Sequence, residues 1–175
     1  MRREKWCQSL PYRAASPAIR SWLKEPASLT ARLQKRCTTF RVRPLCQGLQ
    51  KTLPDDAVQF PVRQVQVREV LLECDGQAVI FAHTILSTAT RRGRLSLWLK
   101  GLGSRSLGSL LFAHPGFIRG SLEFARLDRR HALYRRAAEW ADLPSELWAR
   151  RSSHRLDGLE VVVTEVFLPA IAKSA

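Results

Sequence analysis

Two charged residues stand in runs that otherwise resemble buried strands. Glu165 interrupts the apolar sequence EVVVTEVFLPA, and Arg68 lies in QVREVLL. A buried carboxylate needs a partner, because an unpaired buried charge costs too much free energy, and Arg68 is the best candidate. Arginine keeps its proton, so a buried arginine is either half of an ion pair or an anion site. Two interpretations follow: a structural salt bridge (or a solvated sheet edge), or a pocket in which the acid handles protons beside a bound anion.

Two Asp-Gly pairs predict the strands that hold these residues. Asp75-Gly76 separates two β-rich runs at 65–74 and 77–86, and Asp157-Gly158 separates runs at 150–156 and 159–168. Asp-Gly between such runs is a strong hairpin signal, since both residues tolerate a positive φ. Further strands are expected at 38–45 and 116–127. The pattern predicts one α+β domain over residues 1–175, with an antiparallel sheet of about six strands.

Within the predicted strand at 159–168, alternation places Glu165 on one face with Val161, Val163 and Phe167. The residues between them, Val162, Thr164 and Val166, take the other face. Both faces are apolar, which indicates a central strand covered on both sides.

Helix signals lie between the strands. Ser16 followed by Pro17, and then Ser28, predict two N-caps, for helices at 18–25 and 29–37. A helix is expected at 95–103, and Ser106 is a plausible cap for another that stops before Pro115. The longest helical stretch is the basic segment 128–142, in which Leu133, Ala137 and Trp140 form one stripe.

The net charge of +14 favours anionic partners. The basic residues come as short pairs among apolar residues, without an RNP motif, zinc finger or basic zipper, so a small polyanionic metabolite explains the charge as well as nucleic acid does. No apolar run is long enough to span a membrane, and the N-terminus lacks the apolar core of a secretory signal. We therefore expect a cytoplasmic protein without a membrane span.

The metal-ligating residue types are scattered along the chain. Cys7, Cys37, Cys46 and Cys74 form no CxxC pair, so neither a zinc site nor a disulfide framework is expected, and the thiols should be buried or idle. The four histidines are isolated, and a lone histidine is usually structural. The sequence thus predicts neither a bound metal nor another cofactor.

Five stretches of the chain together resemble the chorismate pyruvate-lyase (chorismate lyase) family of bacterial ubiquinone synthesis. They are SWLKEPASLTARL, VREVLLECDGQ, LGSRSLGSLLF, LWARRSSHRLDG and VVVTEVFLPA, in the family's order and spacing over nearly the whole chain. The resemblance implies an antiparallel sheet whose ligand is enclosed under two helical flaps. It also implies conversion of chorismate to 4-hydroxybenzoate and pyruvate, without redox cofactor or metal because aromatisation supplies the driving force.

Carried over by position, the family's catalytic arginine and glutamate fall on Arg68 and Glu165, and two further substrate contacts fall on Leu29 and Leu107. Each leucine follows a serine interpreted as an N-cap, which places it in a first helical turn. Backbone N–H groups there lack intrahelical partners and favour an anion. Without the resemblance, both leucines would be interpreted as ordinary core residues.

Three departures from the family are visible. Leu29 stands where methionine is frequent, His83 stands where an arginine is expected, and the segment from Arg126 to Leu147 is longer than in the shortest members. The last two bear on the pocket rim and on substrate access.

Two other functions stay open at this point. One is a non-catalytic ligand-binding module, because effector domains of some bacterial regulators share this fold; such domains normally follow a DNA-binding domain of about 70 residues, for which we expect no room in a chain of this length. The other is nucleic-acid binding, from charge alone, without a base-stacking motif. The expected partner is chorismate, and the expected state is a monomer.

Overall fold

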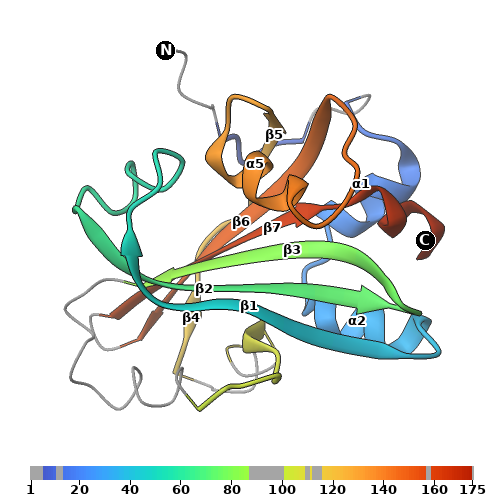
Figure 1. The fold of residues 1–175 in the computed structure, drawn as a ribbon, viewed down its shortest axis with the longest axis horizontal. Coiled ribbons are helices and arrows are strands. Elements are labelled where there is room, and N and C mark those ends of the chain that lie inside the picture. The colour runs from blue at the N-terminus through green and yellow to red at the C-terminus, as the bar shows by residue number, and fades with distance from the viewer. Residues whose placement is uncertain are drawn as a thin grey trace.

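The computed structural model describes residues 6–10, 14–86, 101–108, 111, 116–156 and 159–174. This part of the chain forms one antiparallel sheet of seven strands with short helices on both faces, which confirms the predicted α+β class (Figure 1). The spatial order is β1-β2-β3-β7-β6-β4, and β5 also pairs with β6. The elements in chain order are α1 (Pro17–Leu23), α2 (Leu29–Arg36), β1 (Phe40–Lys51), β2 (Gln64–Cys74), β3 (Gln77–Leu86), β4 (Ile118–Arg119), β5 (Glu123–Asp128), α5 (Ala132–Ala138), β6 (Glu146–Leu156), β7 (Leu159–Phe167) and the 3₁₀ helix η2 (Pro169–Ser174).

Both predicted hairpins are present. Asp75 and Gly76 join β2 to β3 with φ angles of 50° and 80°, the positive values that this short turn requires. In the second hairpin β6 pairs with β7 from Leu156↔Leu159 onwards, although residues 157–158 themselves lie outside the described part. Because β3 and β6 flank β7, the strand that carries Glu165 is central, as its two apolar faces predict.

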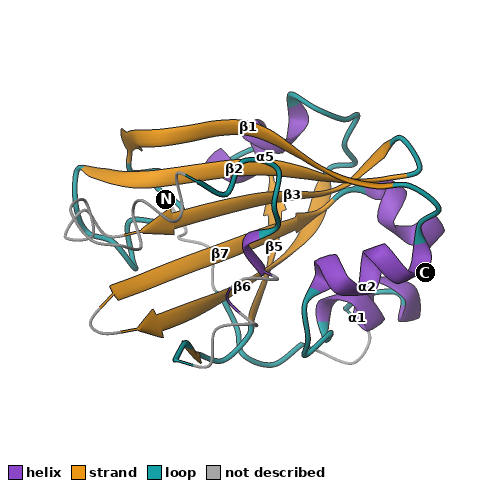
Figure 2. Cartoon of the chain, turned by 90° about the horizontal axis from the view of Figure 1, so that it is seen from below, coloured by secondary structure: helices purple, strands orange, loops and turns teal. Residues whose placement is uncertain are grey.

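The two faces of the sheet have separate cores. On one face α1, α2 and η2 pack on the sheet through Trp22, Leu33 and Ile171, and Figure 2 shows α1 and α2 together at one end of the sheet. On the other face α5 packs through Leu133 and Ala137. The strands twist across the molecule, so that β6 and β7 run obliquely to β1–β3 (Figure 1).

The predicted capping serines of α1 and α2 are confirmed. The Ser16 hydroxyl accepts a hydrogen bond from the Ile19 amide, and the Ser28 hydroxyl accepts one from Ala31. We call residues 17–36, which comprise α1, α2 and their connection, the first flap. The second flap is the described segment 101–108, which turns helical at Leu107. The expected helix at 95–103 lies mostly outside the described residues.

The predicted helix at 128–142 is wrong in extent. The strand β5 continues to Asp128, and the helix that follows, α5, covers only Ala132–Ala138. Leu133 and Ala137 are buried, but Trp140 lies beyond the helix and is 39% exposed. The Arg43 guanidinium stacks over the Trp140 ring at 5.1 Å from its centre. Because Trp140 is not part of the helix, the predicted apolar stripe is one residue too long.

The expectation of unpaired thiols is also wrong for two cysteines. Cys37, at the C-terminal cap of α2, forms a disulfide with Cys74, the last residue of β2, across a Cα–Cα distance of 5.3 Å. Cys46 is a free thiol. The pair was not visible in the sequence, because 37 residues separate two cysteines that only the packing of α2 on the sheet brings together.

The described helices include none that is long and apolar enough to cross a membrane.

Candidate active site

A pocket between the sheet and the two flaps brings together all four residues predicted for the site. Arg68 and Glu165 line it from β2 and β7, and Leu29 and Leu107 line it from the first and second flap. Apolar side chains, among them Val70 and Leu72, form much of the rest of the wall. The chemistry-bearing residues chosen from the sequence thus share one enclosed space.

The register of the sheet sets the distance between the arginine and the acid. Arg68 pairs with Thr84 on β3, and Glu165 pairs with Ala82 on the same strand. One whole strand lies between them, and neighbouring strands are about 4.8 Å apart, so their backbones are roughly 10 Å apart. The predicted pairing of Glu165 with Arg68 is wrong, because the acid forms its ion pair with another residue.

That partner is Arg150, which the sequence analysis missed. Its Nε donates to Oε2 of Glu165 at 2.6 Å, and its side chain is almost fully buried. Arg150 stands directly opposite Glu165 on β6. The signal was present in the sequence, because a two-residue turn at Asp157-Gly158 pairs position 150 with position 165.

Arg68 has no acidic partner among the described residues. Its side chain is 4% exposed, and its Nη2 donates to the carbonyl oxygens of Gly103 and Arg105 at 3.1 and 2.9 Å. Its Nε is buried, and no hydrogen-bond partner for it lies in the part of the chain that the structure describes. Burial lowers the pKa of this guanidinium from its usual value. A buried cation held by neutral carbonyls favours an anionic ligand.

The flaps place their leucines over this charged floor. Leu29 is the first residue of α2, directly after the capping Ser28, and Leu107 follows Ser106 in the second flap. Both leucines are buried. The hydroxyls of Thr30 and Ser106 are hydrogen-bonded at 2.7 Å, and this bond ties the two flaps together above the pocket.

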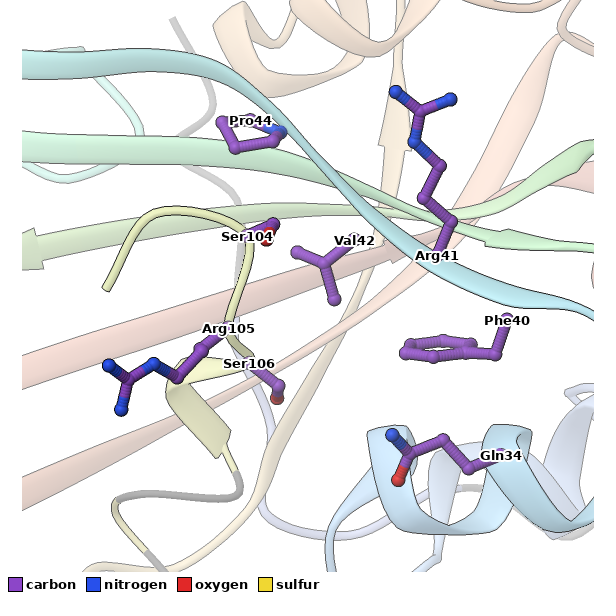
Figure 3. Close-up of a pocket in the computed structure, with 8 residues that line it drawn as sticks. All are labelled: Gln34, Phe40, Arg41, Val42, Pro44, Ser104, Arg105 and Ser106. Atoms are coloured by element: carbon purple, nitrogen blue, oxygen red, sulfur yellow. The ribbon is translucent and has the colours of Figure 1, made fainter. Parts of the chain in front are cut away.

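The space inside the pocket is small as the flaps stand. Its free volume is about 40 Å³, enough for a few water molecules, since one needs roughly 10–15 Å³ measured in this way. An open groove of about 660 Å³ adjoins it and shares Val42 and Ser106 with its wall. Figure 3 shows this outer groove between β1 and the second flap, with Gln34 of α2 at its end. Entry or exit of a ring-sized ligand therefore requires the flaps to move apart.

His83, the residue that departs from the family, lies on the opposite face of the sheet. Its neighbours on β3, Ala82 and Thr84, line the pocket, while His83 itself is buried between two acids. Its Nδ1 is 2.9 Å from Glu69 Oε1 and its Nε2 is 3.0 Å from Asp56 Oδ2. Burial lowers its pKa, but the hydrogen bonds and charges of Asp56 and Glu69 outweigh burial and raise the pKa to about 9. His83 therefore does not form part of the pocket rim, contrary to the expectation from the sequence.

Known protein sequences resemble this chain over almost its whole length. The family model described as chorismate lyase matches residues 1–175. A protein of Dechloromonas aromatica named probable chorismate pyruvate-lyase is 59% identical over 98% of both chains. One from an Azoarcus species with the same name is 46% identical, over 96% of this chain and 92% of its own.

Solved structures show the same fold at low sequence identity. The effector domain of PhnF from Mycobacterium smegmatis covers 82% of this chain and 89% of its own, with a TM-score of 0.54 and 16% identity. The C-terminal domain of a histidine utilization repressor from Pseudomonas syringae covers 75% of this chain and 93% of its own, with a TM-score of 0.52 and 6% identity. Identities this low establish the fold and leave the activity open.

Proposed function

The chain belongs to the chorismate lyase family, and we propose that it converts chorismate to 4-hydroxybenzoate and pyruvate in the pocket between the sheet and the flaps. The observation that carries the proposal is the pair of unlike charges on the pocket floor. Arg68 on β2 has no acidic partner among the described residues, and Glu165 lies on β7, with β3 between the two strands. Chorismate carries two carboxylates and a ring hydroxyl, so it needs both a cation and a hydrogen-bond acceptor.

Substrate binding follows from the buried guanidinium. A carboxylate or ether oxygen of chorismate would accept hydrogen bonds from the donors that Arg68 does not spend on Gly103 and Arg105. Leu29 and Leu107 would cover the ring, and their backbone amides, at first helical turns, would face a carboxylate. Closing both flaps over the ligand excludes water and strengthens these interactions.

The reaction breaks one carbon–oxygen bond and one carbon–hydrogen bond. The enolpyruvyl ether oxygen leaves the ring with the bonding electrons, the neighbouring ring carbon loses its hydrogen, and the ring becomes aromatic. The departing enolpyruvate takes up a proton and becomes pyruvate. Arg68 stabilises the negative charge that builds on the leaving oxygen, as a fixed donor at low dielectric.

In this proposal Glu165 takes part in the proton transfer. Among the described residues its side-chain partner is Arg150, which engages Oε2. The other carboxylate oxygen is then left for the substrate, either to accept the ring hydrogen or to orient the ring hydroxyl. We place the reaction in the cytoplasm, at the first committed step of ubiquinone biosynthesis.

The second candidate function is ligand binding without reaction, which the regulator effector domains of the same fold suggest. The names of the sequence relatives do not favour it. One experiment separates the two. The purified protein is mixed with chorismate, 4-hydroxybenzoate is followed by absorbance, and pyruvate is followed with a coupled dehydrogenase. Equal amounts of both products, formed faster than without protein, support the lyase; binding of 4-hydroxybenzoate without any turnover supports the binding module.

A further inference from the structure

The connection between α1 and α2 is anchored to the sheet by arginine side chains. Arg150 Nη1 donates to the carbonyl oxygen of Glu25 at 2.7 Å, with a longer contact of 3.4 Å to that of Leu23. Arg119 Nη1 donates to the carbonyl of Pro26, the next residue along. These carbonyls belong to residues shortly before Ser28 and Leu29, and these two residues are where the first flap meets the pocket.

The same guanidinium holds the acid of the pocket. While Nη1 of Arg150 binds the flap, its Nε binds Glu165 at 2.6 Å. A guanidinium is planar and rigid, so its donors cannot move independently of one another. Arg150 is also almost fully buried, and a buried donor that loses its acceptor is costly. A displacement of residues 23–25 must therefore change how Arg150 holds Glu165.

We propose that Arg150 is a positioning residue that couples closure of the first flap to alignment of Glu165. With the flap closed, the carbonyls of Leu23 and Glu25 fix the guanidinium, and the guanidinium fixes the carboxylate. When the flap opens to admit substrate or release product, this support is lost. The coupling is reciprocal, so a ligand that needs Glu165 aligned also favours the closed flap. The inference rests on the proposed function, because it assigns Glu165 a role in that reaction.

A purely structural role for Arg150 makes a different prediction. If Arg150 only neutralises Glu165, any buried cation at this position should serve. Arg150→Lys keeps the charge, but a single ammonium on a flexible stem cannot hold the carboxylate and the flap carbonyls in one fixed plane. The conservative variant therefore separates coupling from neutralisation. Arg155→Gln is the matched control, because Arg155 lies on the same strand and pairs with Glu160 at the surface.

The experiment measures two quantities for each variant: kcat with chorismate, and the dissociation rate of 4-hydroxybenzoate by rapid displacement. We expect Arg150→Lys to stay folded with a lower melting temperature, to release product about tenfold faster, and to lose at least about tenfold in kcat, the low side of what a positioned proton-transfer group contributes. Arg155→Gln should match the parent in both. Parental kcat and release in Arg150→Lys would overturn the coupling.

A double-mutant cycle gives a second test, which also serves if Arg150→Lys folds poorly. Glu165→Gln, Arg150→Gln and the combined variant, which removes both charges, are compared by product dissociation rate. Coupling predicts that Glu165→Gln changes release less in the Arg150→Gln background than in the parent; equal effects in both backgrounds would contradict it. Product release does not require turnover, so a parent that binds 4-hydroxybenzoate without converting chorismate would refute the proposed function and leave this test readable.

Discussion

Arg68 and Glu165 line one pocket from β2 and β7, two strands with β3 between them, and each side chain is bound to a different partner. The arginine is held by carbonyl oxygens of the second flap, and the acid is held by Arg150. This arrangement leaves a positive and a negative group facing the same small space without cancelling one another. It suits a substrate that is an anion on one side and a proton donor on the other.

Replacing Arg68 should remove most activity while the protein stays folded. Carbonyl oxygens of the second flap hold the Arg68 guanidinium in place. Arg68→Ala removes this preorganised donor for the leaving oxygen, which should lower the rate by about 10²–10³. The measurement is kcat/KM with chorismate, together with a melting curve. Arg63→Ala is the control, because Arg63 is exposed just before β2. Parental turnover in Arg68→Ala would make Arg68 a structural residue.

The product should bind tightly enough to hold the flaps closed. The pocket is smaller than a ring-sized ligand requires, so the flaps must open for exchange, and such opening often limits turnover. We expect 4-hydroxybenzoate to inhibit the reaction and to raise the melting temperature by mass action. Inhibition assays and thermal shifts over a product series test this. Neither effect at saturating product would indicate an open site.

Turnover should continue in excess chelator. In the part of the chain that the structure describes, no group of three His, Cys, Asp or Glu side chains is arranged to hold a metal ion. The proposed elimination also asks only for a cation and a proton acceptor. The check is kcat measured with and without EDTA after extensive dialysis. Activity that disappears with EDTA and returns with a divalent metal would refute the mechanism.

The hairpins could be predicted from sequence for a physical reason: Asp-Gly turns fix strand register locally, and register fixes which side chains share a face. The four site residues were instead expected from the resemblance to a known family. The strand order could not be predicted in the same way, because it depends on how the two hairpins meet. That order decides that β3 separates Arg68 from Glu165. The same register argument pairs Arg150 with Glu165, as the structure shows.

Other features depended on distant packing. The Cys37–Cys74 disulfide joins the end of α2 to the end of β2, and no local signal relates these positions. The length of α5 was overestimated at both ends: β5 pairs with β6 as far as Asp128, turns at 129–130 precede the helix, and turns at 139–140 follow it.

The buried cluster behind the pocket predicts how stability depends on pH. His83 is held between Asp56 and Glu69, and Glu69 also pairs with Arg136 of α5 at 2.8 Å. The pKa of His83 is raised from about 6.5 in the unfolded chain to about 9. The protonated histidine therefore stabilises the fold fully below pH 6.5. This contribution is lost as the pH rises through about 9, at about 1.4 kcal/mol per unit of pKa shift.

Urea unfolding at a series of pH values measures this contribution. The parent should lose stability between about pH 6.5 and 9, and His83→Gln, which cannot titrate, should be less stable at pH 6.5 but flatter over that window. His131→Gln is a control, because His131 is a half-buried histidine that contacts Asp128. The same slope in His83→Gln as in the parent would show that His83 does not carry the effect.

The most direct test of the account is Glu165→Gln, which keeps the size and hydrogen bonding of the side chain but removes its charge and its ability to accept a proton. Turnover of chorismate, binding of 4-hydroxybenzoate and the melting temperature are measured on the same preparation. Glu160→Gln, on the same strand and paired with Arg155 at the surface, is the control. We predict a folded protein that still binds product and is at least about tenfold slower, while the control matches the parent. Unchanged turnover with a large fall in melting temperature would instead make Glu165 a buried counter-ion of Arg150 with no part in the chemistry.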